Sequence, residues 1–98
     1  MTRGEHVLNN LEDLRSYVYE TLCERETLVS GAFRMSEQLL IRAGKPCGMH
    51  FCVHGPRAVM ITAIWETQQN SILFYDSTGV RFLTTRLVDA PQLQAVAA

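Results

Sequence analysis

The sequence predicts a single α+β domain in which an N-terminal amphipathic helix packs on a four- to five-stranded antiparallel β-meander. Three observations carry this prediction. Apolar residues first recur at helical spacing, the period changes to two after Gly31, and each segment with the second period ends at a short turn signal. The 98 residues suit one domain, and an apolar fraction of 47% is ordinary for a folded chain. We therefore expect one domain over residues 1–98.

The predicted helix runs from about Leu11 to Arg25. Asn10 is suited to cap its first turn, where Glu12 and Asp13 complement the positive end of the helix dipole. The apolar stripe at helical spacing comprises Leu11, Leu14, Val18 and Leu22. This stripe is the side of the helix that should face a core.

The predicted meander covers about residues 33–88. Its five candidate strands are Phe33–Ala43, Cys47–His54, Arg57–Thr67, Ser71–Asp76 and Val80–Leu87. The connections are too short for parallel crossovers, so consecutive strands should pair antiparallel. The last connection fits a type I turn with Gly79 in the left-handed conformation. Residues 1–8 are expected to be loose, and residues 89–98 to form a frayed tail.

Side chains alternate across a strand, so the turn positions sort them into two faces. A tight turn at Gly55-Pro56 would pair Val53 with Ala58. The turn around residues 68–70 would pair Ile64 with Phe74, and the turn at Gly79 would pair Phe74 with Phe82. The first face is uniformly apolar and suits the helix: Leu39, Ile41, Cys47, Met49, Phe51, Val53, Met60, Ile64, Ile72, Phe74, Val80 and Phe82. The second face is mixed: Leu40, His50, Cys52, His54, Val59, Ile61, Ala63, Trp65, Leu73, Tyr75, Arg81 and Leu83.

The second face leads to the favoured functional hypothesis. One short helix cannot cover both faces, and monomers rarely expose a large contiguous apolar patch. The face should be closed by a second copy, a partner, a ligand, the chain's own ends, or curvature of the sheet toward a half-barrel. We expect a non-enzymatic protein-interaction module, most simply a homodimer. The expected interface residues are Ile61, Trp65, Leu73, Tyr75, Arg81 and Leu83.

A small-ligand or metal site is the alternative. His50, Cys52 and His54 share one face of one strand, and imidazole and thiolate are zinc ligands. Three consecutive same-face residues span too far to ligate one ion easily, and no second Cys/His pair completes the set. In the competing interpretation, Cys52 packs as a small hydrophobe. No cofactor is predicted and no catalytic residue is assigned, because no oxyanion hole accompanies the thiol.

A weaker alternative is single-stranded nucleic-acid binding, with His54, Trp65, Tyr75 and Arg81 as a stacking platform. A net charge of −1 and the lack of an RNP-like aromatic motif disfavour it. No apolar run could span a bilayer, and the N-terminus lacks the apolar core of a signal peptide, so we expect a cytoplasmic protein without membrane contact. Three cysteines without a CxxC motif should be free thiols.

One further observation concerns a run of short motifs along the predicted meander. These are Cys47-Gly48-Met49-His50-Phe51, Gly55-Pro56-Arg57, Ala63-Ile64-Trp65, Leu73-Phe74-Tyr75-Asp76, Gly79 and Arg81-Phe82. Together they resemble short uncharacterised bacterial proteins of the kind found in planctomycetes. The resemblance would cover the helix and the meander. It implies no known activity, so no functional residue is carried over from it.

Overall fold

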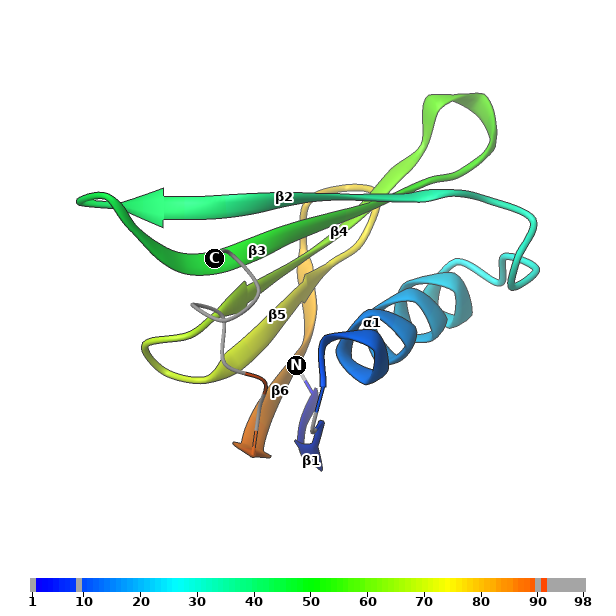
Figure 1. The fold of residues 1–98 in the computed structure, drawn as a ribbon. Helices are drawn as coiled ribbons and strands as arrows, with labels where there is room; N and C mark the ends of the chain where they lie inside the picture. Colours follow the sequence, from blue (N-terminus) through cyan, green and yellow to red (C-terminus); the bar gives the residue numbers. More distant parts are fainter. Residues whose placement is uncertain (1, 9, 90, 92–98) are drawn as a thin grey trace.

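The structure, a computed structural model, describes the backbone of residues 2–8, 10–89 and 91, and the side chains of residues 8, 10–88 and 91. Figure 1 shows one helix lying across one face of a twisted sheet. The elements in chain order are β1 (Thr2–Val7), α1 (Leu11–Arg25), β2 (Met35–Arg42), β3 (Lys45–His54), the 3₁₀ turn η1 (Pro56–Ala58), β4 (Met60–Glu66), β5 (Ser71–Tyr75) and β6 (Arg81–Asp89).

The sheet has six strands in the order β1-β6-β5-β4-β3-β2. The strands β2 to β6 each pair antiparallel with the next strand along the chain, which confirms the predicted α+β meander. The sheet is open, with β1 and β2 at its two edges, so it is not closed into a barrel. Within the described residues, no helix is long and apolar enough to cross a membrane.

The prediction for residues 1–8 is wrong, because Thr2–Val7 form the edge strand β1. This strand runs parallel to β6, and Thr2 pairs with Leu83 (Figure 1, blue beside orange). Its hydrogen-bonding partner comes from the opposite end of the chain, and a short segment carries no local signal for such a pairing. Most of the expected tail, residues 90 and 92–98, lies outside the described residues, while β6 extends through Asp89.

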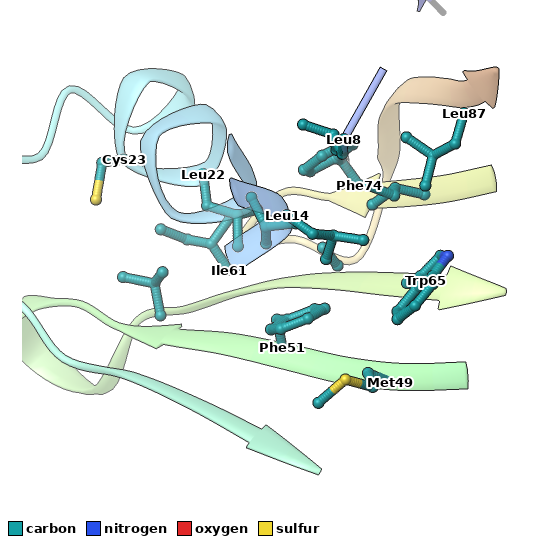
Figure 2. Packing of buried hydrophobic residues seen from close by; sticks show 14 residues of the cluster. Leu8, Leu14, Leu22, Cys23, Met49, Phe51, Ile61, Trp65, Phe74 and Leu87 are labelled. Atoms are coloured by element: carbon teal, nitrogen blue, oxygen red, sulfur yellow. The ribbon is translucent and has the colours of Figure 1, made fainter. Parts of the chain in front are cut away.

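The helix is confirmed at its predicted bounds. The Asn10 side chain accepts a hydrogen bond of 2.8 Å from the backbone N–H of Asp13, as an N-cap does. Leu14, Val18 and Leu22 are buried against the sheet. Figure 2 shows Leu14 and Leu22 on the helix side of the core, above side chains from the strands.

The predicted assignment of side chains to the two sheet faces is right for Met49, Phe51 and Val53 of β3, but the predicted register between β3 and β4 is wrong. The loop after β3 is longer than a two-residue turn, and the N–H of Gly55 donates to the carbonyl of Val59 at 2.8 Å. Val53 therefore pairs with Ile61 rather than with Ala58, and this shift of three residues reverses the side-chain parity of β4. The physical cause is that Arg57 and Ala58 both adopt left-handed backbone conformations (φ 58° and 61°), which such residues rarely do.

The corrected parity changes the membership of the core. Ile61, Ala63 and Trp65 of β4 lie beneath α1, with Phe51 of β3 and Phe74 of β5 beside them (Figure 2 labels four of the five). Three residues predicted for the core are instead exposed: Ile41, Met60 and Val80. Ile64, also predicted for the core, lies on the opposite face because its neighbours in β4 point inward.

The turn between β5 and β6 has the predicted conformation, with Gly79 at φ +85° and its N–H donating to the Asp76 carbonyl at 3.0 Å. Tyr75 pairs with Arg81, as predicted, but a bulge follows and Phe74 pairs with Leu83 rather than Phe82. Leu83 consequently packs against the core under α1.

Candidate interaction face

The sheet face opposite α1 is covered by no helix or strand among the described residues; we call it the uncovered face, and it is ordered in three rows. Residues directly opposite one another in register have side chains on the same face, so each row crosses the sheet from β2 to β6. The middle row is Gln38, His50, Ile64, Leu73 and Thr84. The row on one side of it is Ser36, Cys52, Thr62, Tyr75 and Arg81. The row on its other side is Leu40, Gly48, Glu66, Ser71 and Arg86.

The centre of the uncovered face is apolar. Ile64 and Leu73 are register partners on adjacent strands, and both are half-buried without any contribution from α1, which lies on the other side (Figure 1). Tyr75 is half-buried in the neighbouring row, and Cys52 is 7% exposed. Hydroxyl, amide, imidazole and charged groups surround this centre, as at the rim of a protein interface.

The structure separates the predicted interface residues into two groups. Leu73, Tyr75 and Arg81 lie on the uncovered face. Ile61 and Trp65 are 0% and 1% exposed beneath α1, and Leu83 faces the same core, so these three predictions are wrong. Their error follows from the reversed parity of β4 and from the bulge in β6.

Sequence reasoning missed Ile64 as a residue of this face, although the sequence contains the signal. Within β4, the polar residues Thr62 and Glu66 share the parity of Ile64, whereas Ile61, Ala63 and Trp65 are all apolar. This alternation indicates which side of β4 is buried. The assumed turn geometry outweighed it in the prediction.

The candidate metal residues share the uncovered face as predicted but do not form a ligand cluster. Across the part of the chain that the structure describes, no group of three or more His, Cys, Asp and Glu residues could hold a metal ion. Nε2 of His54 lies 2.9 Å from the Ser36 hydroxyl, and Cys52 lies opposite Ser36 and Thr62 in its row. His50 pairs with Gln38 and Ile64.

Burial of the Cys52 thiol favours its protonated form. Burial raises its pKa above the ordinary value, and the positive charge of Arg34 offsets this only in part. A thiolate is the form that attacks an electrophile or binds a metal, so a raised pKa disfavours both roles. The residue behaves as a packing thiol at the base of the face.

The Ser36–His54 pair has the contact that a nucleophile and its base require. In a working dyad, a third group orients the imidazole. Among the described residues, His54 has no second side-chain hydrogen bond that could serve this purpose. Ser36 and His54 thus share a part-buried hydrogen bond in which no orienting third side chain is described.

A concave region lies between α1 and the start of β6. This open pocket of about 510 Å³ is lined by Tyr17, Thr21, Glu24, Arg25, Phe82 and Leu83. Arg25 stacks 4.7 Å above the Phe82 ring and lies 3.6 Å from a carboxylate oxygen of Asp76, while the hydroxyl of Tyr17 bonds to that of Thr85 at 2.6 Å. Tyr17, Thr21 and Arg25 are thus engaged within the chain, which makes this pocket a weaker candidate than the uncovered face.

Comparisons of the chain with protein-family models, with curated proteins and with solved structures found no match. The functional argument therefore depends on the geometry of the uncovered face.

Proposed function

We propose that this protein is a non-enzymatic interaction module that associates with a second copy of itself through the uncovered face. The observation that carries the proposal is the Ile64–Leu73 pair, an apolar centre on the sheet face that α1 leaves open. Removing such a centre from water is the main favourable contribution to protein association. Tyr75 adds an amphipathic side chain of a kind enriched at interfaces.

The surroundings of this centre support docking rather than catalysis. The protonated Cys52 thiol and the isolated Ser36–His54 pair are poor nucleophiles, whereas both can pack and hydrogen bond within an interface. The planar stacking platform proposed for nucleic acid loses its largest member, because Trp65 lies in the core. Protein association is thus the function that the face supports best.

The mass in solution tests the proposal. We expect sedimentation equilibrium to report twice the chain mass at high concentration and a decrease toward the monomer on dilution. Leu73→Lys and Ile64→Lys should each weaken the dimer about tenfold or more, because docking would bury a charged amine without a partner.

Val29→Lys is the matched control, since Val29 is an exposed apolar residue in the loop after α1 and the substitution adds the same charge away from the face. It should leave the dimer unchanged, and circular dichroism should show all three variants folded. A wild-type chain that is monomeric at every concentration would refute the proposal.

A further inference from the structure

We infer that the two copies pack face to face about a two-fold axis that runs along β5, so that Glu66 of each copy meets the partner's Arg86. This inference rests on the proposed function and specifies the arrangement of the dimer. It is carried by the row that contains the two charges.

Glu66 and Arg86 are placed symmetrically about β5. Glu66 on β4 pairs with Ser71 on β5, and Ser71 pairs in turn with Arg86 on β6. Adjacent strands lie about 4.8 Å apart, so the two charged residues flank Ser71 at equal distances, with about 10 Å between their backbones. Neither residue takes part in the Arg15–Glu37 or the Arg25–Asp76 ion pair.

A two-fold axis uses the same surface on both copies. In the inferred dimer, the axis lies between the two sheets and runs parallel to β5. Each row of one copy then lies opposite the same row of the other copy, and β4 of one copy faces β6 of the other. Glu66 then lies opposite the partner's Arg86, and Arg86 lies opposite the partner's Glu66. Leu73 and Tyr75 pack against their own counterparts at the centre.

The dimensions permit these contacts. Packed sheets are about 10 Å apart, and the twist of each sheet rotates the strands of one about 30° from those of the other. Both charged side chains are long, and that of Arg86 is exposed, so they can span the offset that the rotation introduces. The resulting two ion pairs would compensate the charges that docking removes from water.

The charges also discriminate against an arrangement with the axis across the strands. Such an axis would run along the middle row, perpendicular to the strands. Each outer row of one copy would then lie opposite the other outer row of its partner. Arg86 would then lie opposite the partner's Arg81, because both belong to β6, and Glu66 would lie opposite the partner's Thr62. Like charges in contact oppose association, so the axis along β5 is favoured over the axis across the strands.

Charge reversal tests the inference. Glu66→Arg and Arg86→Glu should each weaken the homodimer about tenfold or more, because each places like charges in contact twice. An equimolar mixture of the two variants should form a heterodimer with near wild-type affinity, since both pairs become complementary again. Native mass spectrometry can measure this, because the two chains differ in mass, and the Glu66→Arg/Arg86→Glu double variant should also recover the dimer.

Other outcomes separate this inference from the function on which it rests. If the mixture and the double variant stay monomeric while Leu73→Lys disrupts a wild-type dimer, the arrangement is wrong and the proposed function stands. A monomeric wild-type chain that binds single-stranded oligothymidylate in a salt-dependent manner would overturn both.

Discussion

At the scale of single residues, Gly48 shows how a missing side chain permits the close approach of two strands. A Cβ atom at this position would lie 2.2 Å from the backbone oxygen of Trp65. The adjacent Cys47 carbonyl accepts hydrogen bonds from both the N–H (3.1 Å) and the hydroxyl (2.9 Å) of Thr67. The start of β3 is thereby held tightly against the end of β4.

We predict that Gly48→Ala lowers the free energy of unfolding by about 1–3 kcal/mol, because the added methyl group would clash with the backbone of β4, which cannot shift without disturbing the sheet. Urea denaturation measures this change. Gly55→Ala is the control: its nearest neighbours would be 3.4 and 3.5 Å away and its φ is −82°, so we expect a change within about 0.5 kcal/mol. Equal decreases in the free energy of unfolding of the two variants would contradict the close approach of Gly48 to the Trp65 backbone.

At the scale of elements, the turn between β5 and β6 is organised by one carboxylate. Oδ1 of Asp76 accepts hydrogen bonds from the hydroxyl (2.6 Å) and N–H (2.9 Å) of Thr78 and from the N–H of Val80 (3.1 Å). The hydrogen bond from the Thr78 hydroxyl contributes most to lowering the pKa of Asp76, and Arg25 of α1 adds to it. The turn and the end of the helix are therefore linked electrostatically.

This lowered pKa predicts an acid-dependent contribution to stability. Ionised Asp76 stabilises the folded state fully above the ordinary aspartate pKa of about 3.9, and the contribution is lost as the pH falls through the lower pKa of the folded state. The stability difference between wild type and Asp76→Asn should thus be largest above about pH 4 and shrink below it. Urea denaturation at several pH values measures the difference. A gap that stays constant down to pH 2 or so would contradict this account.

At the scale of the whole molecule, α1 divides the sheet into a buried face and an uncovered one. Trp65, the only tryptophan, lies on the buried face and is 1% exposed. Its fluorescence should therefore report folding and be insensitive to contacts made by the uncovered face.

We predict that the Trp65 emission maximum does not shift when a wild-type dimer is diluted, nor in the Leu73→Lys variant. Unfolding in urea, the positive control, should shift it to longer wavelength. A shift of the emission maximum on dilution, without unfolding, would mean that Trp65 faces the partner. That is the position in which the sequence-based register of β4 placed it. The same measurement verifies that the Leu73→Lys variant retains its core.

The features that could be predicted are those decided by neighbours in sequence. The N-cap at Asn10, the apolar stripe of α1 and the Gly79 turn each depend on contacts within a few residues, and all are present. Antiparallel pairing of consecutive strands follows from short connections. On the uncovered face, Leu73 and Tyr75 were predictable because β5 is short and its alternation is unambiguous.

What the sequence by itself determined is the α+β meander and the existence of two unlike sheet faces, because periodicity and turn residues are local properties. Only the tertiary structure decided which face carries Ile61, Ile64 and Trp65, since left-handed Arg57 and Ala58 lengthen one loop and so reverse an entire strand. It also decided that β1 pairs with β6, a contact between the two ends of the chain. The juxtaposition of Glu66, Ser71 and Arg86 has the same origin, because residues from three strands become neighbours only when the register between the strands is set.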